Sequence, residues 1–159
     1  MNLLPFFEWL DTSLLADIAK AYGGVFAVVQ MFHLLALALL GGTVLLSDLR
    51  LLGVLMKEVP AQVVVENTHK WFTVALIVLI LSGTFMAAAV AMKLYYNEMF
   101  WAKMISLAAG IVFVYAIRRP LLLKFDHDTI NPWAVRLVAI TSIIIWFTVA
   151  GSGRWIGFS

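Results

Sequence analysis

Four long runs of apolar residues alternate with polar segments along the chain, and each run is long enough to cross a membrane. The runs occupy about residues 25–47, 71–92, 100–117 and 133–151. An α-helix needs roughly 20 apolar residues to span the hydrocarbon of a bilayer. A membrane bundle of this size rarely divides, so we expect residues 1–159 to form one domain. The pattern predicts an all-α fold, a four-helix transmembrane bundle.

The first 22 residues carry a different pattern, in which apolar and charged positions share a helical period. One face holds the apolar residues, which are Phe7, Leu10, Leu14, Ile18 and Ala21. The opposite face holds Glu8, Asp11, Asp17 and Lys20. The segment lacks the basic start and compact apolar core of a signal peptide. The pattern predicts an N-terminal amphipathic surface helix over residues 1–22, which either lies on the outer leaflet or packs as a lid on the bundle. Residues 11–13 also favour helix caps, so a break there is an alternative.

Basic residues are distributed unevenly between the two ends of the predicted bundle. The segments 48–70 and 118–136 contain Arg50, Lys57, Lys70, Arg118, Arg119, Lys124 and Arg136. The opposite end has Lys20, Lys93, Lys103 and Arg154. Short loops rich in lysine and arginine stay on the cytoplasmic side. We therefore expect a multi-pass protein of the bacterial inner membrane, with both termini in the periplasm.

The composition supports a membrane protein and disfavours most enzyme classes. Hydrophobic residues make up 64% of the chain, charged residues 13%, and the net charge is +2. Without cysteine there is no disulfide, thiolate metal site or iron–sulfur cluster. No basic run indicates nucleic-acid binding, and no phosphate-binding loop, HExxH motif or nucleophile–histidine–carboxylate spacing occurs. These absences favour an electron-transfer or accessory membrane subunit over an enzyme, with the lipid bilayer as its surroundings.

A stripe of mixed polar and small residues follows one face of the first predicted span. Its members are Gln30, His33, Leu37, Gly41, Val44 and Asp48, at spacings of three and four. Such a stripe is expected to face protein rather than lipid. His33 lies eight residues beyond Val25, which is about 12 Å along a helix. We therefore place this imidazole in the outer half of the bilayer.

Three interpretations compete for His33. It ligates the iron of haem b; or it hydrogen-bonds to Gln30, to water, or to a hydroxyl on another helix; or it binds copper or relays protons. The hydroxyls expected at its level belong to Ser82, Thr84 and Ser106.

The other histidines do not complete a two-histidine haem site within one chain. His69 lies at the cytoplasmic edge of the second span, and His127 lies in a cytoplasmic loop. Met86 is level with His33 and is a candidate second ligand, although core filling is the alternative. A His33 from a second chain is another candidate. With the small-residue row Gly83, Ala87 and Ala91 as a packing surface, this predicts a homo-oligomer or a subunit of a larger membrane complex.

Two further polar groups lie near the cytoplasmic edge. Asp48 is expected to meet Arg118, Arg119 or Lys70, either as a structural ion pair or as a proton-entry group. Asn131 precedes Pro132 and is a candidate cap for the fourth span. His127, between Asp126 and Asp128, belongs either to a solvated loop or to a metal site.

Several segments together resemble a known pattern. An amphipathic N-terminal helix is followed by "HLLALALLGG", "SDLRLLG" and "YYNEMFWAKM". This order resembles a family of small bacterial four-helix membrane proteins of unknown function. The chain is also loosely similar to the membrane domain of copper-resistance D proteins and to b-type cytochrome bundles. Those looser resemblances imply copper handling or haem, with His33 as the one position carried over.

Three functions are therefore expected in order. The first is haem-b binding through His33, with Met86 and Gln30 beside the cofactor, and electron transfer within or to a membrane complex. The second is a non-catalytic structural or assembly subunit of such a complex. The third is copper handling.

Overall fold

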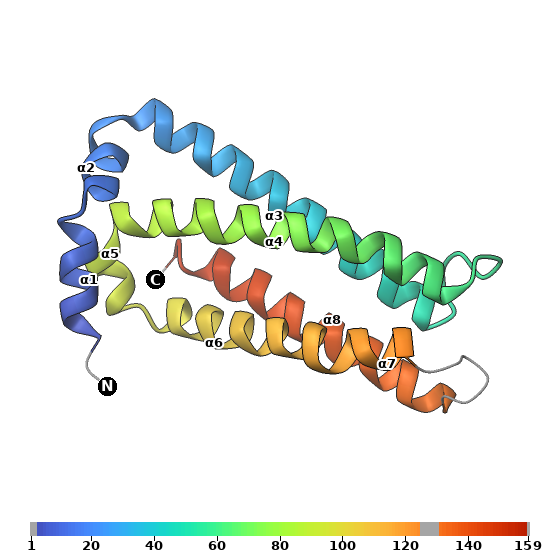
Figure 1. Cartoon of the computed structure of the whole chain (residues 1–159). Coiled ribbons are helices and arrows are strands. Elements are labelled where there is room, and N and C mark those ends of the chain that lie inside the picture. The colour runs from blue at the N-terminus through green and yellow to red at the C-terminus, as the bar shows by residue number, and fades with distance from the viewer. Residues whose placement is uncertain (1–2, 125–130, 159) are drawn as a thin grey trace.

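A computed structural model describes residues 3–124 and 131–158, and this part of the chain contains helices but no strands. The long elements are α3 (Gly23–Leu51), α4 (Ala61–Ala89), α6 (Glu98–Val112) and α8 (Pro132–Trp155). Short elements are α1 (Leu4–Asp11), α2 (Leu14–Ala21), α5 (Ala91–Tyr95), the π-helix η1 (Phe113–Arg118) and α7 (Arg119–Lys124). Figure 1 shows the long helices side by side as a bundle.

The four expected spans are confirmed as helices. Four helical stretches are long and apolar enough to cross a membrane, and the third is Glu98–Leu122, in which α6, η1 and α7 run on from one another. The second stretch ends at Ala89, three residues earlier than expected, because the backbone breaks at Val90 before α5 begins. The chain is therefore a multi-pass membrane protein with a four-helix bundle.

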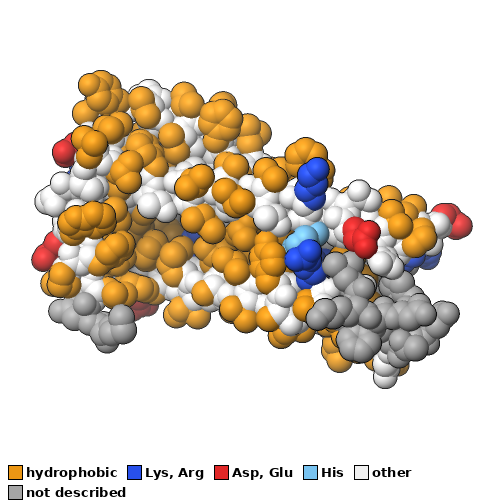
Figure 2. Space-filling model, viewed as in Figure 1, with side chains coloured by type: hydrophobic (Ala, Val, Ile, Leu, Met, Phe, Trp, Pro, Cys, Tyr) orange, Lys and Arg blue, Asp and Glu red, His pale blue; other side chains and the backbone are white. Residues whose placement is uncertain are grey.

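The bundle buries a small core and exposes most of its apolar side chains. Helix α3 packs chiefly on α4 and α8, and α6 packs on α8. The central core consists of Leu40, Val44, Phe72, Ala75, Leu76, Val114, Trp146 and Val149. Many large apolar side chains elsewhere on the long helices face outward and cover the flank of the molecule (Figure 2). Lipid is the solvent that suits such a surface.

Glycine allows one close approach between helices. A Cβ on Gly110 of α6 would lie 3.1 Å from Ile145 and 3.2 Å from the Trp146 ring, both on α8. The missing side chain therefore lets α6 approach α8 and seats Trp146 in the core.

The N-terminal segment forms a lid on one end of the bundle, and its helix breaks where cap residues stand. We call this end the lid end, made by α1, α2 and α5; the opposite end, with residues 52–60 and the start of α8, is the loop end (Figure 1). The Ser13 hydroxyl caps α2 by accepting from Ala16 N. Phe7 and Leu10 pack with Ala91 and Leu94, which confirms the lid interpretation.

The single apolar face expected over residues 1–22 is wrong beyond this break. Leu14 is 74% exposed, whereas Ala16 and Ala19 are buried. The reason is geometric, since the break at Ser13 starts a new helix with a new direction and rotation. The expected cap of α8 is confirmed, because Asn131 Oδ1 accepts from Trp133 N at 2.9 Å.

Candidate functional site

His33 lies on α3 and faces α4 within the same chain. Its Nδ1 is 2.8 Å from Ser82 Oγ. The ring lies against Gly83, where an added Cβ would be 3.3 Å from His33 Cε1. Helices α3 and α4 form the most extensive helix pair of the bundle, so the ring is held from two sides by a firmly packed element. Of the three hydroxyls expected at this level, Ser82 is the partner. Thr84 and Ser106 donate instead to carbonyls of their own helices.

The Ser82 contact decides which imidazole nitrogen carries the proton. Ser82 Oγ donates its one hydrogen to Val78 O, 2.5 Å away. A hydroxyl has a single hydrogen to donate, so towards His33 it acts as an acceptor. The donor is then Nδ1–H, and in the neutral ring Nε2 keeps a free lone pair. Histidine ligands of metals show this arrangement, in which the second ring nitrogen donates to a protein group.

Three further side chains surround this region with different exposure. Lys103 on α6 lies close enough to His33 to interact electrostatically, and its stem runs along Gly153 of α8. Met86 is half-buried on α4, one turn beyond Ser82 on the same face. Gln30, which was expected to face protein, is exposed on the surface of the single chain.

The small-residue row on α4 packs within the chain. Gly83 receives the His33 ring, and Ala91 is fully buried beneath the lid with Phe7 and Leu10. At these positions the row therefore meets neighbours of its own chain, which a packing surface for a second chain would not do.

His69 lies in a separate aromatic environment towards the loop end. Its ring stacks near Phe72 at a centroid distance of 6.3 Å and meets Tyr115 edge-on at 5.4 Å. Thr73 and Tyr115 hydroxyls are 3.0 Å apart beside it. His69 precedes Ser82 by thirteen residues of α4, which is about 20 Å along the helix. It therefore cannot share one haem iron with His33. His127 lies outside the described residues.

A second polar cluster joins three segments inside the bundle. Arg118 Nη2 is 2.7 Å from Asp48 Oδ1 and donates to Ser47 Oγ at 2.5 Å. Asp48 is fully buried, and the Arg118 side chain is 6% exposed. Ser142 of α8 is also fully buried and interacts with the Asp48 carboxyl. Of the three basic partners considered for Asp48, Arg118 is the one that pairs with it.

Parts of this cluster lack hydrogen-bond partners. Asp48 Oδ2, Arg118 Nε, Ser142 Oγ and Trp146 Nε1 are buried without a partner of ordinary geometry. The Ser142–Asp48 interaction therefore falls short of a well-formed hydrogen bond, and we give the geometric criterion more weight than the electrostatic one. Buried polar atoms that face each other in this way commonly hold an internal water.

Sequence reasoning missed Ser47, Ser142 and Trp146 in this cluster. Ser142 and Trp146 are four residues apart near the middle of a span, so they share one helical face and were detectable as paired polar groups. The π-helix η1, which ends at Arg118, had no comparable signal. Such insertions of an extra residue per turn occur often at functional sites.

Comparisons with known proteins place the chain in a family without adding a function. Among residues 3–124 and 131–158, no group of three or more histidine, cysteine, aspartate or glutamate side chains is placed to hold a metal ion. No curated protein and no solved structure matches the chain. A family model, described as a family of unknown function, matches residues 6–159. The chain, a four-helix membrane protein with a histidine held between α3 and α4, therefore belongs to the family of unknown function DUF6644.

Proposed function

We propose that this chain binds haem b through His33 and passes electrons within, or to, a larger complex of the bacterial inner membrane. The observation that carries the proposal is the protonation of the ring. Ser82 holds Nδ1–H, so Nε2 has the lone pair that an axial ligand needs. Gly83 fixes the plane of the same ring.

The donor set of the described residues suits a cofactor that brings most of its own ligands. A copper ion held only by histidine and carboxylate side chains needs a cluster of them, and the described part of the chain has none of three or more. A porphyrin supplies four nitrogens, so the protein contributes only one or two axial ligands. When bound, haem supplies one-electron redox chemistry. This comparison ranks haem ahead of copper handling.

The chain's own residues would then orient the cofactor and balance its charge. His33 Nε2 would be the first axial ligand, and Met86, on the same α4 face as Ser82, is the candidate for the second. Lys103 places a positive charge near His33, which suits the carboxylates of haem propionates. Apolar helices around the site would exclude bulk water.

A role as a non-catalytic assembly subunit is the second candidate, and Gln30 favours a partner chain under either function. This amide is exposed on α3, seven residues from the helix start, where lipid offers it no hydrogen bond. A second copy or another subunit would satisfy it.

Optical spectra and native mass spectrometry of the purified protein test the first function. Protein expressed with ample haem supply is expected to show a Soret band that shifts on reduction with dithionite. Its mass from mild detergent is expected to correspond to bound haem and to more than one chain. A colourless preparation would contradict haem binding and favour the assembly role. A homogeneous monomer would contradict the partner proposed for Gln30.

Membrane orientation has its own test, because the chain has no cysteine and single-cysteine variants are therefore clean. Lys57→Cys lies in the loop after α3, and Tyr96→Cys lies at the lid end, where Tyr96 is 73% exposed. With the loops cytoplasmic, an impermeant maleimide added to spheroplasts is expected to label Tyr96→Cys and to spare Lys57→Cys until the cells are lysed. The reverse pattern would place both termini in the cytoplasm.

A further inference from the structure

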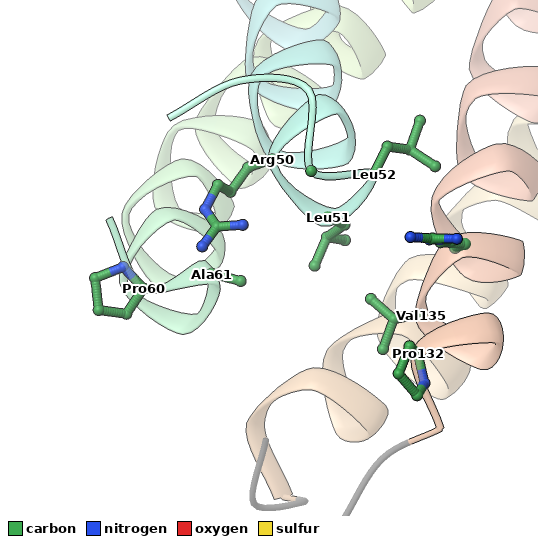
Figure 3. A pocket seen from close by; sticks show the side chains of 9 residues that line it. Arg50, Leu51, Leu52, Pro60, Ala61, Pro132 and Val135 are labelled. Carbon is green, nitrogen blue, oxygen red and sulfur yellow. The ribbon is translucent and has the colours of Figure 1, made fainter. Parts of the chain in front are cut away.

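A pocket of about 400 Å³ opens at the loop end, between the ends of α3 and α4 and the start of α8. Its apolar walls come from Leu51, Leu52, Pro60, Ala61, Pro132 and Val135. In Figure 3, Pro60 and Ala61 lie on one wall, Pro132 and Val135 lie opposite, and Leu51 is between them. The pocket is separate from His33, which lies in the lid-end half of α3.

Two arginines also line this pocket. Arg50 is held in place by its own loop, because its Nε donates to Val59 O at 2.7 Å. The Arg136 guanidinium lies over the Trp133 ring, 5.2 Å from the centroid. Ion pairs in the described part of the chain join Lys20 to Asp11 and Arg118 to Asp48. Neither pocket arginine is in an ion pair there, so two positive charges remain available to an anion.

The pocket lies at the depth where lipid phosphates are found. Helix α3 ends at Leu51, and α8 begins at Pro132, so the spanning helices leave the hydrocarbon at this level. Trp133 is 67% exposed beside the pocket, and tryptophan is enriched at membrane–water interfaces. We infer that this pocket binds the headgroup phosphate of an anionic phospholipid from the adjacent leaflet.

The lining favours a lipid over a soluble anion. Guanidinium groups recognise phosphate with paired hydrogen bonds. The apolar walls would contact the glycerol and the first acyl carbons, which a free phosphate lacks. Basic pockets between membrane helices bind anionic headgroups in this manner. The inference is independent of haem, since it uses neither His33 nor its neighbours.

Native mass spectrometry of the full chain with defined lipids tests this inference. The probes are phosphatidylglycerol and phosphatidylcholine with identical acyl chains, and inorganic phosphate. Wild type is expected to retain phosphatidylglycerol in preference to phosphatidylcholine. Arg50→Gln or Arg136→Gln is expected to weaken phosphatidylglycerol binding about fivefold, and both together about 25-fold. Arg154→Gln, a basic residue at the lid end over Phe158, is the matched control and should bind as wild type does.

Each other outcome overturns the inference. Equal retention of the two lipids, or a double variant that binds phosphatidylglycerol normally, would exclude a headgroup site here. Equal weakening by Arg154→Gln would show a non-specific charge effect. Displacement of phosphatidylglycerol by millimolar phosphate would show a soluble-anion site. Should Arg50→Gln disturb the loop through its bond to Val59, the Arg136→Gln variant alone decides, because that side chain contacts only Trp133 in the described part of the chain.

Discussion

Replacing Arg118 with alanine is expected to lower the free energy of unfolding by about 3–5 kcal/mol, because it leaves the buried Asp48 carboxylate without its counter-ion. Asp48 is fully buried, and Arg118 supplies the only ion pair that it makes in the described part of the chain. Ser47 would lose the same donor. Reversible unfolding in mixed detergent micelles, followed by circular dichroism, measures the change.

The chain offers a matched control and a rescue. Lys20 and Asp11 form an ion pair of similar length, 2.9 Å, but their side chains are 43% and 32% exposed. An exposed pair contributes about 0–1 kcal/mol, so Lys20→Ala is expected to have little effect. Asp48→Leu combined with Arg118→Met removes both charges and is expected to be more stable than Arg118→Ala alone. Equal effects of Arg118→Ala and Lys20→Ala would contradict a buried pair.

The His33→Ala variant is expected to lose the Soret band completely, because no other described side chain offers an imidazole at that level of the bundle. His69→Ala is the control and should keep the band, since His69 lies about 20 Å away along α4. Ser82→Ala should keep the ligand nitrogen but lose the group that orients it. Removal of such a supporting partner weakens metal binding roughly 10–100-fold. Titration of apoprotein with haem measures all three variants.

The rival role for His33 gives a different result in the same series. If the ring only packs and hydrogen-bonds, no variant changes a spectrum, and His33→Ala and Ser82→Ala each lower stability by about 0.6–1.7 kcal/mol, as interhelical hydrogen bonds in membranes do. Loss of the Soret band in His69→Ala with retention in His33→Ala would assign the ligand to the wrong end of the molecule and would overturn the proposed site.

The amino-acid sequence by itself determined the number of spans, their approximate limits and the cap at Asn131, because apolar length and cap chemistry are local properties. It also narrowed the partner of His33 to three hydroxyls and the partner of Asp48 to three basic residues. These predictions rest on the rise of a helix per residue, which sets depth without reference to other helices.

Only the tertiary structure decided which candidates meet. Depth leaves rotation about the helix axis undetermined, and rotation is what turns Ser82 towards His33 while Gln30 faces outward. The π-helix η1 changes the rotation of the third span just before Arg118, which is placed beside Asp48. The break at Ser13 likewise changes which apolar residues of the lid are buried. The pocket between Arg50 and Arg136 joins segments more than 80 residues apart, so it exists only because packing brings α8 beside the end of α3.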